Sequence, residues 1–90
     1  MKFQKYTEVR YDPTDGHAFR VRRWKASLSA PVAVDYYIDR VPGGFRVKVV
    51  PFVGEAGVLG VLPLFHAAVE LAERHAAVEA DAIVETERGA

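Results

Sequence analysis

The stretch GGFRVKVV, residues 43–50, and the alanine-rich segment LFHAAVELAERHAAV, residues 64–78, together decide the fold of this chain. In the first stretch Phe45, Val47 and Val49 alternate with other residues, which predicts a strand with one apolar face. In the second, apolar residues recur every three or four positions, which predicts one long helix. A glycine-rich loop joins the two. We therefore predict an antiparallel sheet covered by a single helix.

Tight turns and alternating residues predict the remaining strands. Residues 12–16, DPTDG, combine proline, aspartate and glycine in the manner of a hairpin turn. Residues 25–31 break the alternation and end in Pro31, which predicts a loop. The fold class is therefore α+β, with a four- to five-stranded antiparallel sheet and one long C-terminal helix packed on one face. The predicted strands are residues 3–11, 17–24, 32–39, 45–52 and a short fifth at 58–62.

Length and composition limit the class of protein. Ninety residues, half of them apolar, predict a single globular domain over residues 1–82, followed by a tail at 83–90 that continues the helix, docks separately or frays. The absence of cysteine excludes disulfides, thiol nucleophiles and zinc–thiolate sites. The longest apolar run, residues 58–65, is far shorter than the roughly 20 residues that cross a membrane, and residues 1–5 lack a secretory apolar stretch. We expect a cytoplasmic protein with no membrane partner.

The predicted helix has an apolar stripe wider than one sheet face requires. At 100° per residue the main arc contains Leu64, Ala67, Ala68, Leu71, Ala72, His75 and Val78. Phe65, Val69 and Ala76 widen this arc on one side. This surplus apolar surface suggests a homodimer.

The histidines give no clear sign of catalysis. His66 and Glu70 lie four residues apart with Glu73 nearby, but they form an exposed stripe without a remote ligand, so we predict a solvated face and no metal. His75 lies within the apolar arc. It is either a pH-sensitive or ligand-binding residue in a pocket, or a partly buried histidine bonded to a strand carbonyl, which we favour.

Other polar motifs have equally simple interpretations. Asp12 and Asp15 before Gly16 lack the further oxygen ligands of a calcium loop and predict a plain turn. The loop glycines match neither phosphate-binding fingerprint, and the two serines have no histidine near them in sequence. We therefore expect no catalytic residue, no cofactor and no enzyme activity.

Charge provides the remaining functional signal. Residues 1–50 carry ten Lys/Arg and five Asp/Glu, whereas residues 51–90 carry two and seven, and the formal net charge is zero. The strands are therefore basic and the helix acidic. If the basic strand faces point away from the helix, they form one surface that binds an acidic protein, binds single-stranded nucleic acid by stacking and phosphate contacts, or is merely solvated. The candidate partner-binding residues are Arg20, Arg22, Trp24, Tyr37, Arg46 and Lys48, with Tyr6 beside them.

The segment from Tyr36 to Ala76 contains a strand, the run Gly43-Gly44-Phe45, a second strand, the step Leu59-Gly60 and an Ala/Glu-rich helix that ends near His75. This pattern resembles that of short accessory proteins of phages and prophages. The opening MKFQKY, residues 1–6, is similar to the start of a small anti-CRISPR protein. The resemblance implies a phage-type protein that inhibits or adapts a host defence complex by occlusion, and it assigns no site residues. The matching residues are Tyr36, Tyr37, Ile38, Gly43, Gly44, Phe45, Val47, Leu59, Gly60, Ala67, Ala68, Leu71, Ala72, Glu73 and His75.

Overall fold

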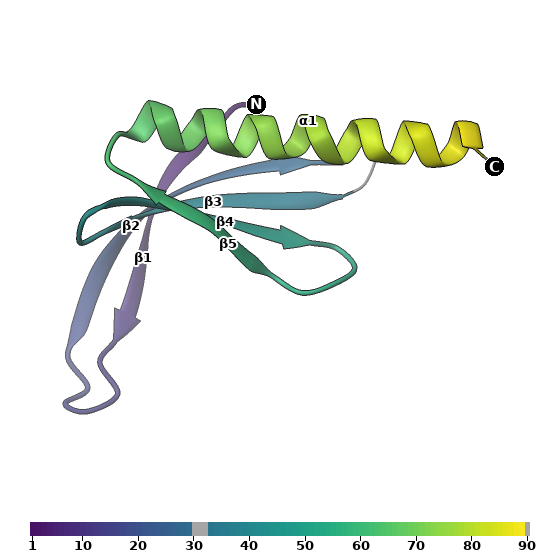
Figure 1. Ribbon diagram of the computed structural model, residues 1–90. Helices are drawn as coiled ribbons and strands as arrows, with labels where there is room; N and C mark the ends of the chain where they lie inside the picture. Colours follow the sequence, from purple (N-terminus) through teal and green to yellow (C-terminus); the bar gives the residue numbers. More distant parts are fainter. Residues whose placement is uncertain (30–32, 90) are drawn as a thin grey trace.

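Five antiparallel strands and one long helix make up the fold (Figure 1). This computed structural model describes the backbone of residues 1–29 and 33–89, and the side chains of residues 1–29 and 33–80. The strands pair in chain order, β1-β2-β3-β4-β5, and the helix packs against β3, β4 and β5. The elements are β1 (Gln4–Tyr11), β2 (Ala18–Leu28), β3 (Val34–Val41), β4 (Gly44–Pro51), β5 (Gly57–Leu62) and α1 (Phe65–Gly89).

The predicted α+β class is confirmed, with all five strands in one sheet. Figure 1 shows α1 lying along one side of the sheet and extending past the strand ends, while the β1–β2 hairpin projects away from it. The molecule is correspondingly elongated, with extents of 54 × 26 × 19 Å. Helix α1 runs to Gly89 and does not end near Val78, so residues 83–89 continue the helix.

The loop predicted at residues 25–31 is wrong in its first half. Residues 25–28 extend β2 and pair with β3, where Ala26 lies opposite Tyr36 and is buried. The alternation of buried and exposed side chains continues to Leu28, but it is hard to recognise in the sequence because Ala26 and Ser27 are both small. The prediction for Pro31 and for a strand start at Val32 lies outside the described residues.

The core lies between β3, β4 and the first half of α1. Tyr36, Ile38, Val47, Ala68 and Ala72 are fully buried there. The predicted apolar faces of the two central strands therefore point toward the helix. Alanine at two of these helix positions leaves room for α1 to approach the sheet closely.

An aromatic cluster joins the start of α1 to the sheet. Trp24 from β2, Phe45 from β4 and Phe65 from α1 lie with ring centroids 4.7–5.9 Å apart. The rings are tilted or edge-to-face, the arrangement that aromatic pairs prefer. Val69 and Ala76, on the same side of the helix, also pack against the core. Phe65, Val69 and Ala76 are therefore part of the fold, and the surplus dimer surface predicted from them is wrong.

The turn between β3 and β4 depends on two glycines. Gly43 and Gly44 both have positive φ, 91° and 143°. Around Gly43 there is open space, whereas a Cβ at Gly44 would lie 2.2 Å from the carbonyl oxygen of Leu62 at the end of β5. Gly44 therefore permits a close backbone approach in addition to the turn itself.

Candidate functional site

The face of the sheet opposite α1 is the candidate site. No helix or strand covers it within residues 1–29 and 33–89. Strand register identifies its side chains, because alternate residues of each strand point away from the buried core. This open face consists of Gln4, Tyr6, Glu8 and Arg10 from β1, Phe19, Val21, Arg23, Lys25 and Ser27 from β2, Asp35, Tyr37, Asp39 and Val41 from β3, Arg46, Lys48 and Val50 from β4, and Val58 and Val61 from β5.

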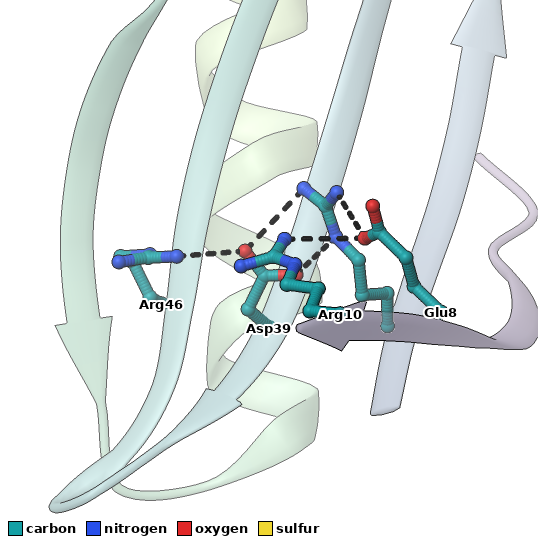
Figure 2. A network of polar contacts seen from close by, with 5 residues as sticks. Glu8, Arg10, Asp39 and Arg46 are labelled. Carbon is teal, nitrogen blue, oxygen red and sulfur yellow. Dashed lines mark hydrogen bonds and ion pairs between the residues drawn. The ribbon is translucent and has the colours of Figure 1, made fainter. Parts of the chain in front are cut away.

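A chain of ion pairs crosses four strands of the open face (Figure 2). Its centre is Asp39, which is 1% exposed and accepts hydrogen bonds from Arg23 Nε and from an Arg46 amino group at 3.0 Å. Arg23 also donates to Glu8 at 3.0 Å, and Arg10 donates to the same carboxylate at 3.1 Å. These five residues form the ion network, which links the strands side chain to side chain.

Register explains how the ion network forms. Asp39 lies directly opposite Arg23 on β2 and Arg46 on β4, so two guanidinium groups flank one carboxylate. Glu8 lies on β1 diagonally from Arg23, within reach of its second amino group. Arg23 is 12% exposed on its side chain, so both members of the central pair are removed from water. Removal of one partner from a buried ion pair of this kind leaves an uncompensated buried charge, which strongly destabilises the fold.

The ion network shifts two of its own pKa values. Hydrogen bonds from Arg23 and then Arg10 hold the pKa of the Glu8 carboxyl below its ordinary value. Burial alone would lower the pKa of the Arg23 guanidinium, but its hydrogen bonds to Glu8 and Asp39 outweigh that effect and raise it. Both groups therefore remain charged near neutral pH.

We expect the free energy of unfolding to fall less steeply with decreasing pH in Glu8→Gln than in the wild type. Because the pKa of Glu8 is lower in the folded protein than in the unfolded chain, its stabilisation is present above the ordinary glutamate range and is lost as pH falls through the folded value. Melting temperatures across a series of acidic buffers measure this. The control is Glu55→Gln in the exposed β4–β5 loop. Identical acid profiles for Glu8→Gln and the wild type would contradict the assignment.

Beside the ion network, a second row places an aromatic ring between two lysines. Lys25 pairs in register with Tyr37, and Tyr37 pairs with Lys48. The Arg23 guanidinium lies 4.4 Å from the centroid of the Tyr37 ring, and Lys25 Nζ lies 5.6 Å from it. We call Lys25, Tyr37 and Lys48 the Lys-Tyr-Lys row. Lys25 has a long ion pair of 3.9 Å with Asp35, whereas Lys48 has none among the described residues.

A shallow hollow continues this basic surface toward the N-terminus. It has a volume of about 720 Å³ and is open to solvent. Lys2, Lys5 and Lys25 line it, together with Tyr6 and Ser27. Lys25 belongs to the open face, whereas Lys5 lies opposite Trp24 in register and its Nζ is 5.9 Å from the centroid of the Trp24 ring, on the helix side of the sheet.

The six predicted partner-binding residues do not share one face, and this prediction is wrong in its geometry. Trp24 packs against Phe45 and Phe65 on the helix side of the sheet. Arg20 and Arg22 alternate with Trp24 and share that side, where both are exposed near the β1–β2 hairpin. Only Tyr37, Arg46 and Lys48 come together on the open face.

Sequence reasoning missed the residues that connect this group. Arg23, Lys25 and Arg10 complete the open face. The sequence feature that indicates them is the alternation of Trp24, Ala26 and Leu28. If the strand is taken to continue to Leu28, these three residues form its apolar face, and Trp24 points toward the helix. Once β2 is given its full length, Arg23 and Lys25 point outward.

The remaining candidates have structural roles. His75 Nδ1 lies 2.8 Å from the hydroxyl of buried Tyr36, so the histidine meets a strand phenol and not the expected strand carbonyl. Asp12 and Asp15 accept hydrogen bonds from the backbone amides of Thr14 and His17, each at 2.8 Å, as the predicted turn requires.

The helix stripe predicted to be solvated is exposed, and it contains His66, Glu70 and Glu73. The described side chains contain no group of three or more metal-ligating residues placed to hold an ion.

Comparison with known proteins identifies no relative. No family model, no curated protein and no solved structure matches the chain. Within the described part of the chain, no helix has the length and apolar character needed to cross a membrane.

Proposed function

We propose that this chain is a small non-enzymatic binding protein whose open face recognises an acidic surface of a protein partner. The observation that carries the proposal is the Lys-Tyr-Lys row on an uncovered sheet face. Lysine ammonium groups beside a tyrosine ring suit a carboxylate-bearing partner with apolar groups close by. Lys2 lines the hollow beside this row, together with Lys25 and Tyr6.

The ion network supports a binding role by fixing the platform. Its carboxylates and guanidinium groups bind one another, so the network holds four strands in register and keeps Tyr37 in place through Arg23. Preorganised contact residues reduce the entropy lost on binding. In this arrangement the ion network is scaffold, and the Lys-Tyr-Lys row makes the contacts.

Mixed charge on the open face favours a protein partner over nucleic acid. Five cationic side chains share the face with three carboxylates, and the whole chain has a formal net charge of zero. Domains that neutralise a phosphate backbone usually carry a clear positive excess. The carboxylates of Glu8 and Asp35 would repel the phosphates of a nucleic acid. A protein surface that carries charges of both signs can place cations opposite them.

Charge reversal on the open face tests the proposal. We expect Lys25→Glu with Lys48→Glu to weaken partner binding by at least about 100-fold, because attraction becomes repulsion at the contact. The matched control is Arg20→Glu with Arg22→Glu, two reversals on the other face of the same sheet. The immobilised wild type captures the partner from host lysate, and calorimetry with the purified partner then measures all three affinities.

Each outcome of this experiment has a distinct meaning. Loss of binding only in the Lys25/Lys48 variant supports the open face. Loss only in the Arg20/Arg22 variant moves the interface to the helix side and rejects the proposal. Binding to a single-stranded oligonucleotide that falls steeply with salt, with no protein partner, replaces it with the nucleic-acid alternative.

The resemblance to phage accessory proteins suggests which kind of protein the partner is. We propose that the partner belongs to a bacterial defence complex and that the protein acts by occluding it. Expression in bacteria carrying a panel of such systems, challenged with a targeted plasmid or phage, tests this. The wild type should restore infection or transformation, whereas the Lys25/Lys48 variant should not. No effect across the panel would reject the role in bacterial defence. The proposed binding by the open face would then be tested by calorimetry alone.

A further inference from the structure

Strand β5 presents an unusually bare edge. In the described part of the sheet β5 has a neighbour only on its β4 side. Its sequence, Gly-Val-Leu-Gly-Val-Leu over Gly57–Leu62, contains no charged residue and no proline. The opposite edge, β1, carries Lys5, Glu8 and Arg10. Charges and prolines are among the means by which proteins prevent edge strands from pairing, and β5 has neither; its own irregularity is one unpaired residue, Leu59, in the pairing with β4.

Apolar side chains are also exposed below this edge. Val58 and Val61 lie opposite Lys48 and Arg46 in register, and are therefore on the open face. They are 58% and 50% exposed. The irregularity in the β4–β5 register lies between them, and both still point to the same side.

A second apolar row lies above the edge, on α1. Leu71 approaches β5 closely, since a Cβ at Gly60 would lie 3.5 Å from a Leu71 methyl group. Leu64 lies two turns before Leu71 on the same side of the helix, directly after the end of β5, and it is 54% exposed. The β5 edge is thus a bare backbone ladder with exposed apolar groups on both sides.

We propose that a second copy of the chain pairs with this edge, β5 against β5, to form a two-fold dimer with one continuous ten-stranded antiparallel sheet. Two copies of one strand related by a two-fold axis perpendicular to the sheet run antiparallel, which continues the pattern of the other four pairings. Because β5 is uncharged, the pairing brings no like charges together.

A second copy covers more of this edge than other occupants would. A single extended peptide would satisfy the backbone of β5 but would bring no matching apolar groups of its own. A second copy brings a second uncharged strand with the same exposed apolar groups, Val58, Val61 and Leu64, to the same edge. Pairing of β5 with β1 would instead set charged side chains beside an uncharged strand, and would extend without closing.

The dimer has a consequence for the open face. A perpendicular two-fold axis keeps both open faces on the same side of the joined sheet. The two Lys48 side chains then lie on strands adjacent to the joined β5 pair, so the dimer presents two Lys-Tyr-Lys rows to one partner surface. Self-association does not depend on the proposed binding function and is tested without a partner.

Sedimentation of the full chain tests the dimer. We expect the wild type to sediment at twice the 10.0 kDa chain mass. Val58→Lys should raise the dimer dissociation constant at least about 100-fold, because it places two ammonium groups within a closed apolar contact. Val9→Lys is the matched control, since Val9 is 53% exposed on the protected edge strand β1. It should leave the dimer intact, with circular dichroism confirming that every variant folds.

Hydrogen exchange provides a second measurement of the same contact. Those amides of Gly57–Leu62 that point away from β4 should exchange slowly in the wild type and faster when the protein is diluted below its dissociation constant. If Val58→Lys fails to fold, Val61→Lys replaces it with the same expected result. A wild type that sediments as a monomer at high concentration overturns the proposal. So does a dimer that survives both lysine variants or that Val9→Lys alone dissociates.

Discussion

Asp39→Ala is expected to lower the free energy of unfolding by about 3–5 kcal/mol, the range seen when one partner of a buried ion pair is removed. Asp39 is 1% exposed and binds two guanidinium groups. Without it, Arg23 keeps only its hydrogen bond to Glu8 while remaining out of water. Since small domains are stable by only about 5–15 kcal/mol, this single change would remove a large share of the free energy of unfolding.

Urea unfolding followed by circular dichroism measures the effect. The matched control is Asp35→Ala on the same strand and the same face, where the carboxylate is 35% exposed and its ion pair to Lys25 is 3.9 Å long. We expect a loss there of at most about 1 kcal/mol, as for other exposed pairs. Equal losses at the two aspartates would show that the ion network does not hold the strands together.

Gly44→Ala is the second substitution with a large expected effect, about 2–5 kcal/mol. The new methyl group would lie 2.2 Å from the Leu62 carbonyl oxygen, and the backbone would remain at φ +143°. Left-handed backbone costs an alanine about 1–2 kcal/mol, and a steric clash in a packed region adds about 1–3 kcal/mol. Relief of the clash requires the end of β5 to move away from β4, where the chain enters α1.

The neighbouring glycine provides the control for this prediction. A Cβ at Gly43 meets nothing within 4 Å, although its φ is +91°. Gly43→Ala should therefore show only the conformational cost, about 1–2 kcal/mol. Chemical denaturation of both variants compares them directly. If the two alanine substitutions lower the free energy of unfolding equally, the close approach of residue 44 to Leu62 does not contribute to stability.

The sequence predicts the sheet well because alternation is a local property. Val34, Tyr36 and Ile38 repeat at the period of a strand, and the buried face of β3 follows without reference to its neighbours. The helix follows in the same way from its own period. What fails is the assignment of Trp24, because its side depends on whether the strand continues through small residues.

The ion network could not be predicted from spacing alone. Arg23 meets Asp39 and Glu8 because of the register of three strands, and that register follows from the positions of two turns. A shift of one residue in either pairing would turn one partner to the opposite face. The candidate site is thus set by long-range geometry, whereas the core is set by local pattern.

The order of the strands has a consequence for synthesis of the protein. Each strand pairs with the one made just before it, so every hairpin can close as the chain emerges from the ribosome. The helix is made last, and until then the apolar side chains of Tyr36, Ile38 and Val47 have no cover. We expect residues 1–63, held clear of the ribosome by an unstructured C-terminal linker that fills the exit tunnel, to recruit a chaperone, and the released full chain to be free of it. Absence of chaperone from the stalled residues 1–63 would contradict this.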